Sequence, residues 1–199
     1  YKMLDEQKAI KVREFIEGVK VKGKYHGGLK HSKGEYAGTN FILEDWQYKK
    51  VIKPLYGTLN PDGTRQYRTC LIMMAKKNGK TTLAAALALY HLFADKEKGG
   101  EIYAIAIDRD QASLTFDEAT RMVRQNKILL SKCKIIDSRK RIVNYETNSF
   151  FRAIPGDVAS AHGVNPSLAI YDELHAATNR RMFDIFATAG GTRRQPLLI

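Results

Sequence analysis

The chain has 199 residues, of which 44% are hydrophobic, and this length and composition suit one folded domain and exclude a largely disordered chain. Lysine and arginine total 33 against 21 acidic residues, and the formal net charge of +12 favours a polyanionic partner such as nucleic acid. The basic residues are spread over the whole chain, so a solvated basic surface remains the alternative.

Membrane segments, secretion and disulfides are not expected. No apolar run reaches about 18 residues, and the charged, amphipathic N-terminus differs from a secretory signal, so we expect an intracellular protein outside the membrane. Cys70 and Cys133 lie far apart, and neither has a second Cys or His at metal-ligand spacing. Two reduced thiols are therefore expected.

Two helical patterns dominate the N-terminal part. Apolar residues recur with a helical period over residues 2–19 and again over 41–57, where the only tryptophan, Trp46, is expected to anchor the core. The glycine-rich segment 20–40 lacks periodicity and is predicted to be a loop with solvated histidines. Residues 58–66 contain Asn-Pro-Asp-Gly and are predicted to turn.

The stretch from Arg68 to Leu83 reads RTCLIMMAKKNGKTTL, an apolar run followed by a basic turn and Gly-Lys-Thr. Strand, loop and helix in this order are typical of a phosphate-binding loop, in which backbone N–H groups and a helix N-terminus face an anion. Lys80 would reach the outer phosphates, and the Thr81 hydroxyl would hold Mg²⁺. The residues assigned to nucleotide binding are Lys77, Asn78, Gly79, Lys80, Thr81 and Thr82.

The match is incomplete, because the full pattern has glycine where this chain has Met74. A lysine-rich turn ahead of an ordinary helix is the alternative, since Asn-Gly is also common in tight turns. A partner motif has to decide between the two.

Helices and strands alternate after the loop. A helix is predicted over 82–94, a buried strand over 101–107 and an amphipathic helix over 108–127. This alternation indicates an α/β fold with a mainly parallel central sheet flanked by helices. Residues 135–154 contain three short β-like pieces, which predict an antiparallel β meander inserted into the sheet or flanking it.

The partner motif lies at residues 165–177, NPSLAIYDELHAA, where an apolar strand is closed by Asp172 and Glu173. In P-loop ATPases a carboxylate that ends such a strand holds Mg²⁺ through water, and a following glutamate polarises the attacking water. Glu173 and Lys80 are therefore the candidate catalytic residues, and Thr81 and Asp172 the candidate metal site. Helix capping by the acidic pair is the alternative. The two motifs together predict a site for ATP and Mg²⁺ at the carboxyl edge of the sheet.

At this point the sequence resembles the large subunit of the tailed-phage terminase, the ATP-driven DNA-packaging motor, in the branch that includes phage HK97. The resemblance spans nearly the whole chain and rests on five segments: REFIEG, FILEDWQ, MAKKNGKTT, SAHGVNPSLAIYDELHAA and GTRRQPLLI. It implies a P-loop NTPase fold of the ASCE, RecA-like type.

The resemblance also implies residue roles that spacing does not show. The family tolerates a non-glycine residue at the position of Met74, and Lys76 is implied to be a catalytic residue that helps to sense the γ-phosphate. Trp46 and Gln47 are implied to form an adenine-side motif, in which Gln47 hydrogen-bonds the base.

The family further uses an arginine finger from a neighbouring subunit. This chain has His162 where some relatives carry arginine. Arg139, Arg141 and Arg152 are the remaining candidates, with a surface position or a DNA contact as the alternative for each.

At the level of the whole protein, the resemblance implies Mg-ATP hydrolysis that drives double-stranded DNA into a procapsid in the host cell cytoplasm. The implied partners are the portal protein, the small terminase subunit and further copies of the chain in a ring, a pentamer in the family, with a monomer expected in isolation. Residues 1–57 would hold the N-terminal helices and adenine-side motif, and 68–199 the P-loop core.

We expect residues 1–199 to be the ATPase domain of a longer protein. A Thr-Thr-Ala-Gly coupling motif and the nuclease domain would follow Ile199, so the P-loop core is expected to be incomplete and nuclease activity absent.

Two other functions fit parts of the sequence. Residues 172–175, Asp-Glu-Leu-His, also satisfy the DExH pattern of helicase-type nucleic-acid ATPases, although strand separation normally needs a second RecA-like half that 199 residues do not contain. A basic DNA-binding module without catalysis, in which the loop is only structural, is the third possibility.

Overall fold

A six-stranded sheet forms the centre of the computed structural model, which describes residues 3–75, 77–156, 161, 163–177 and 179–199. The strands are β5 (Glu101–Ala106), β6 (Cys133–Ile136), β7 (Arg141–Asn144), β8 (Ser149–Pro155), β9 (Leu168–Tyr171) and β10 (Leu197–Leu198), in the order β10-β9-β5-β8-β7-β6. The first four of that order run parallel, while β8, β7 and β6 are antiparallel. The predicted α/β sheet with a flanking meander is confirmed.

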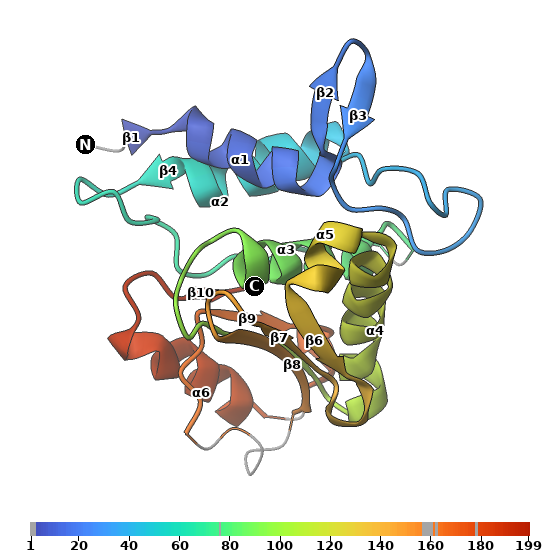
Figure 1. Ribbon diagram of the computed structural model, residues 1–199. Coiled ribbons are helices and arrows are strands. Elements are labelled where there is room, and N and C mark those ends of the chain that lie inside the picture. The colour runs from blue at the N-terminus through green and yellow to red at the C-terminus, as the bar shows by residue number, and fades with distance from the viewer. Residues whose placement is uncertain (1–2, 76, 157–160, 162, 178) are drawn as a thin grey trace.

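Alternate side chains of the sheet enter two separate cores. Ile102 and Ala104 of β5 pack into the larger core, whereas Tyr103 and Ile105 pack into the smaller one, as the period of a strand requires. Helices therefore cover both faces, and both faces of the parallel strands are buried. The covering helices are α3 (Lys80–Phe93), α4 (Arg109–Gln125) and α5 (Lys127–Ser131) on one side and α6 (Arg181–Ala189) on the other (Figure 1).

Helix α3 lies between the sheet and the N-terminal helices (Figure 1). Its sequence is rich in Ala and Leu, which are strong helix formers, and its middle is buried on all sides. The N-terminal helices α1 (Glu6–Glu17) and α2 (Lys53–Gly57) pack on its outer face in the larger core. No helix in the described part of the chain is both long and apolar enough to cross a membrane.

The N-terminal segment departs from the predicted pattern in two places. The helix predicted over 2–19 is shorter, because β1 (Met3–Leu4) pairs with β4 (Thr58–Leu59), and Asp5 caps the helix that follows. The predicted loop contains a hairpin of β2 (Val19–Val21) and β3 (Lys24–His26). Its turn residues Lys22 and Gly23 both have positive φ, which suits a tight two-residue hairpin turn. Strands of three residues are too short to show periodicity in sequence.

The second predicted helix, 41–57, begins later than expected and contains an irregular turn. Residues Gln47–Ile52 form a π-helix, η1, that continues directly into α2. Pro54 lies in the first turn of α2, where its ring removes a backbone donor and crowds the preceding turn. The wider π turn ahead of it accommodates that defect.

The strand predicted ahead of the phosphate loop is largely absent. Thr69 forms one parallel bridge with Leu198, and the Cys70 N–H donates to the Leu198 carbonyl at 2.9 Å, but the next residues form no ladder. Leu71 and Met73 are 71% and 85% exposed. Because β10 is only two residues long, it offers hydrogen-bond partners to no more than the first part of this segment.

Both cysteines are free thiols, as predicted. Cys133 is buried at the start of β6, and burial raises its pKa to about 11. The thiolate is the reactive form, so this cysteine is a packing residue rather than a nucleophile.

A buried polar network joins α2, the C-terminal end of α3 and the segment that leads into β10. The Arg65 guanidinium lies 3.2 Å from one oxygen of Asp95 and donates to the Gln195 carbonyl at 2.6 Å. His91 lies between Asp95, 3.3 Å from its Nδ1, and the Tyr56 hydroxyl, 3.0 Å from its Nε2. Both side chains of the Arg65–Asp95 pair are at least nine-tenths buried, so each charge is stabilised by its partner instead of by water.

We expect Asp95→Ala to lower the free energy of unfolding by about 3–5 kcal/mol, because it leaves Arg65 as a buried charge without its partner. Asp184→Ala is the matched control, since Asp184 pairs with Arg180 on the surface, and it should cost about 1 kcal/mol or less. Urea unfolding of both variants measures the two values. Equal losses of unfolding free energy in the two variants would show that the buried Arg65–Asp95 pair stabilises the fold no more than a surface ion pair does.

Stability should also fall below about pH 6.5 through His91. Burial lowers the pKa of His91, against the opposing effect of Asp95, so the folded chain holds the ring neutral at a pH where the unfolded chain takes up a proton. The stabilisation is therefore present above the unfolded pKa and is lost as pH falls through the folded one. In urea unfolding, the stability difference between the parent and His91→Gln should shrink from pH 7.5 to pH 5.5. A stability difference that does not change with pH would show that His91 has the same pKa in the folded and the unfolded chain.

Candidate active site

The predicted acidic pair lies at the carboxyl edge of the sheet. Strand β9 ends at Tyr171, and the Asp172 N–H still donates to the Ile105 carbonyl of the neighbouring β5 at 2.8 Å. This bond fixes the backbone from which both carboxylates project. Lys80, the first residue of α3, faces the same edge, so the fold brings together two motifs that are more than ninety positions apart.

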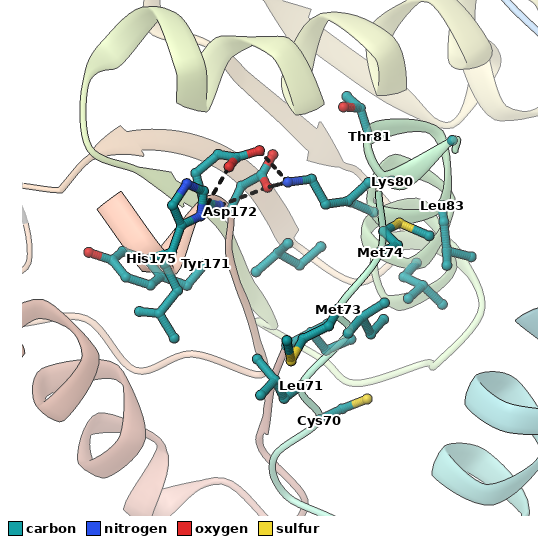
Figure 2. A pocket seen from close by; sticks show the side chains of 18 of the residues that line it. Cys70, Leu71, Met73, Met74, Lys80, Thr81, Leu83, Tyr171, Asp172 and His175 are labelled. Atoms are coloured by element: carbon teal, nitrogen blue, oxygen red, sulfur yellow. Dashed lines mark hydrogen bonds and ion pairs between the residues drawn. The ribbon is translucent and has the colours of Figure 1, made fainter. Parts of the chain in front are cut away.

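Lys80 joins the two carboxylates (Figure 2). Its Nζ lies 2.9 Å from Asp172 Oδ1 and also forms a hydrogen-bonded ion pair with Glu173. Burial works against the charge of Lys80, but the hydrogen bonds and charges of the two carboxylates prevail and raise its pKa. The lysine is thus a fixed cation at physiological pH. His175 adds a further contact, with its Nδ1 3.3 Å from Glu173 Oε2.

The backbone of Glu173 lies in the left-handed region, with φ 53° and ψ 41°. This conformation is sterically unfavourable for a residue with a Cβ atom, and backbone strain of this kind is often found at functional sites. The short 3-10 helix η4 (Leu174–Ala176) begins after Glu173, and its cap lacks a side-chain hydrogen bond from the described residues. The geometry therefore does not favour the alternative in which the acidic pair serves only to cap η4.

The loop before α3 turns sharply at two positions. Lys77 has φ 68° and Gly79 φ 80°, and the Asn78 amide donates to the Ala75 carbonyl at 3.3 Å. Among the described residues no side chain caps the N-terminus of α3, so its first N–H groups are available to an anion. Lys76 lies outside the described residues.

An open pocket of about 1400 Å³ surrounds the lysine and the acidic pair. Thr81 and Thr82 line it from α3, and Lys77 and Gly79 from the loop. Apolar side chains also line the pocket: Leu71, Met73, Ile170, Leu174 and Phe183. Hydroxyl and carboxylate oxygens are the donors that Mg²⁺ prefers, and it usually takes only one or two protein ligands besides phosphate and water, so Thr81 and Asp172 fit its requirements.

The adenine-side residues lie elsewhere in the structure. Trp46 is partly buried, and Gln47 is only 3% exposed, with its Oε1 accepting from the Glu44 N–H at 2.9 Å. Neither residue lines the pocket around Lys80. The contact between Gln47 and the base therefore stays a prediction.

The arginine-finger candidates all lie in the meander: Arg139 between β6 and β7, Arg141 on β7 and Arg152 on β8. Arg139 and Arg152 are exposed, and the Arg141 guanidinium lies 4.0 Å from the centre of the Phe150 ring. None of the three lines the pocket around Lys80, as expected of a group that would act on a neighbouring subunit. His162 lies outside the described residues, and the finger remains a prediction.

The sequence did not predict a second, smaller pocket beside the first turn of α3. Thr81 and Thr82 line it, together with residues 31–33 of the glycine-rich segment and side chains of α4. Residues 31–33 are part of a segment without periodicity and have no recognised motif, so only the fold brings them to the phosphate loop.

Known proteins share both the sequence and the fold of this chain. Residues 45–199 match the family model for the terminase large subunit, ATPase domain. The terminase large subunit of enterobacteria phage HK97 is 32% identical over 169 residues, which is 83% of this chain and 32% of that protein. The chain thus spans about a third of the length of this relative.

Solved structures agree with this comparison. The crystal structure of the HK97 large terminase is similar with a TM-score of 0.76 and 29% identity, over 96% of this chain and 36% of that one. An ATPase-domain mutant of the large terminase of Thermus phage P74-26 has the same fold, with a TM-score of 0.58 at 19% identity over 76% of this chain and 68% of that one. The geometry of the site, the family model and these relatives lead to one conclusion: this chain belongs to the family of terminase large subunit ATPase domains.

Proposed function

We propose that the chain binds Mg-ATP at the pocket around Lys80 and hydrolyses it to drive double-stranded viral DNA into a procapsid. The observation that carries the proposal is the lysine at the start of α3 held against the two carboxylates that follow β9. A cation on a helix N-terminus and an acidic pair facing it are the parts that phosphoryl transfer needs, since this reaction depends on positioning and charge neutralisation.

Each residue of the site has a separate task in this proposal. Lys80 leaves the carboxylates and binds the outer phosphates, while the turn at Asn78 and Gly79 offers its N–H groups to the phosphate oxygens. Thr81, and Asp172 through water, would hold Mg²⁺, which would neutralise phosphate charge. Glu173 accepts a hydrogen bond from the attacking water and polarises it.

The remaining loop residues complete the phosphate contacts. Lys77 and Thr82 line the same pocket and bind phosphate oxygens. Lys76 would sense the γ-phosphate, as the sequence analysis predicts.

The lysine–carboxylate contact also stabilises the acidic pair. Two carboxylates side by side repel each other, and Lys80 cancels part of that repulsion. With Mg-ATP bound, Lys80 would pair with the phosphates instead of the carboxylates. Asp172 would then be available to the metal and Glu173 to the attacking water.

Hydrolysis is proposed to need a neighbouring copy of the chain. No arginine among the described residues lines the pocket, so a finger in trans from Arg139, Arg141 or Arg152 would supply the missing positive charge. The isolated chain is then a monomer with little or no turnover, and a homo-oligomeric ring, a pentamer by family resemblance, is the active form.

The wider role follows from family membership. We propose that the full-length protein acts in the host cell cytoplasm, where it docks on the procapsid through the portal protein and receives DNA with the small terminase subunit. The formal net charge of +12 supports a DNA partner.

Glu173→Gln should retain Mg-ATP binding and lose turnover, because the amide keeps the size of the side chain but not its ability to polarise water. We expect phosphate release in a ring-competent assembly to fall by about 10²–10⁴-fold. Glu146→Gln, on the surface beside Lys132, is the matched control and should keep the parent rate. Turnover at the parent rate in Glu173→Gln would show that another group activates the water.

Gly79→Ala should weaken ATP binding through the backbone alone. No atom lies within 4 Å of an added Cβ, but the φ of 80° costs a residue with a side chain about 1–2 kcal/mol, so the loop shifts away from its phosphate-binding shape. Gly191→Ala is the control, because its Cβ also meets open space and its φ is not in the left-handed region. Calorimetric titration with Mg-ATP should show weaker binding in Gly79→Ala than in the parent and in Gly191→Ala. Equal affinities in all three proteins would show that the loop does not bind the nucleotide.

A further inference from the structure

The β2–β3 hairpin stands out from the body of the molecule, beyond the C-terminal end of α1 (Figure 1). In the described part of the chain its two strands pair only with each other. Residues 19–24 are all exposed, including the apolar side chains of Val19 and Val21. A two-stranded hairpin is marginally stable by itself, so this one has to be held from its base.

Close backbone contacts hold the base of the hairpin. The Asn40 side-chain amide donates to the carbonyls of Glu17 and Gly27, each at 2.8 Å, and so joins the two ends of the hairpin. An added Cβ on Gly28 would lie 2.4 Å from the Gly18 nitrogen, so only glycine lets the two ends approach this closely. The hairpin is therefore a fixed element, and a fixed element loses less entropy on binding.

Positive charge is concentrated on this hairpin and the segment that follows it. Residues 18–34 contain five lysines and no acidic residue. The nearest carboxylate before them in the chain, Glu17, is buried and already paired with Arg13. Three of the five lysines belong to the hairpin, and all three are exposed: Lys20, Lys22 and Lys24. Their charge is not neutralised within their own segment, so it is available to a partner.

The register of the hairpin distributes these cations around the ribbon, because directly paired residues lie on the same face. Lys20 and its partner Tyr25 lie on one face, with the ammonium 5.4 Å from the centre of the ring. Lys24 and its partner Val21 lie on the other face. Lys22 lies at the turn. A molecule that meets this ribbon therefore meets positive charge on both faces and at the tip.

We propose that the β2–β3 hairpin binds duplex DNA, with its three lysines on phosphates of both strands at a groove. This inference rests on the proposed function and names a surface that holds the DNA. The major groove is about 12 Å wide and admits a two-stranded β-ribbon. Phosphates border the groove on both sides, which matches cations on both faces of the ribbon. Contacts from lysine to phosphate carry no sequence information, as movement along any DNA sequence requires.

Two other roles for the lysines lead to different results. Lysines on exposed strands also prevent edge-to-edge association of chains, and in that role they would not affect DNA affinity. An acidic protein surface is the second alternative. DNA is favoured over a protein, because the cations point in three directions and a protein surface would meet only one face of the ribbon.

Salt-dependent binding to a DNA duplex of mixed sequence tests the proposal. The triple variant Lys20→Gln/Lys22→Gln/Lys24→Gln should bind the duplex about 10–100-fold more weakly near 0.1 M salt. The slope of log K against the logarithm of the salt concentration should become shallower by about 2–3, since each lost phosphate contact removes about 0.9. A single strand of the same length has no groove, so its binding should be weakened less.

The matched control is Lys50→Gln/Lys98→Gln/Lys134→Gln, which removes the same charge from exposed lysines outside the hairpin. Its duplex affinity should stay within about threefold of the parent, because it removes no phosphate contact of the hairpin. Equal losses of DNA affinity in the two triple variants, or no loss in either, would overturn the assignment of DNA to the hairpin. Loss of self-association in sedimentation with unchanged DNA affinity would also overturn it and would assign the hairpin to a protein contact.

Titration of the same proteins with Mg-ATP separates this inference from the proposed function. The hairpin variant should bind Mg-ATP like the parent, since none of its three lysines lines the pocket around Lys80. If the parent binds both Mg-ATP and the duplex while the hairpin variant loses neither, the hairpin assignment falls and the proposed function stands. If the parent binds Mg-ATP but no duplex DNA, this inference falls together with the DNA-moving part of the proposed function.

Discussion

The burial of helix α3 between the sheet and the N-terminal helices is the constraint on which the other features depend. A helix that is apolar on all sides has only one environment in which it is stable, so its position in the fold is fixed by solvent exclusion. Its first turn then lies at the carboxyl edge of the sheet and presents Lys80. Its last turn presents His91 to Asp95, and the buried pair with Arg65 ties that end to the segment that enters β10.

Charge is used differently at the two ends of this helix. At the C-terminal end Asp95 is buried with fixed partners, and its role is to hold three segments in register. At the N-terminal end Lys80 is more than a third exposed and shares its charge between two carboxylates beside an open pocket. The first network excludes water and is suited to structure, whereas the second is accessible to a charged ligand that can replace one ion pair by another. The left-handed backbone of Glu173 lies beside the open pocket, at the second of these two places.

The two pockets divide the site by chemistry. One contains a lysine, an acidic pair and helix N–H groups, which suit phosphate and a divalent cation. The other contains His31, Leu114, the cation Lys33 and the Glu118 carboxylate, which is paired with Arg121. The two pockets meet at the first turn of α3, where Thr81 and Thr82 line both. The exposed side chains of Leu71 and Met73 make the first pocket wide, because the segment that carries them forms only one bridge with the sheet.

The sequence by itself determined the α/β class with its mainly parallel sheet, because this depends on local periodicity, and it predicted the phosphate loop at 77–82 and the acidic pair at 172–173 from residue types at short spacing. It also predicted the meander and most of α3. It did not predict the hairpin of residues 19–26, the π turn before Pro54, α6 or the near absence of a strand at 71–75, since these depend on short pairings and neighbouring segments. The sequence predicted that the loop and the acidic pair share the carboxyl edge of the sheet, but only the tertiary structure showed the ion pairs of Lys80 with Asp172 and Glu173 and the position of residues 31–33 beside Thr82. Contacts between segments so far apart in the chain are set by packing of the whole core, and no local pattern encodes them.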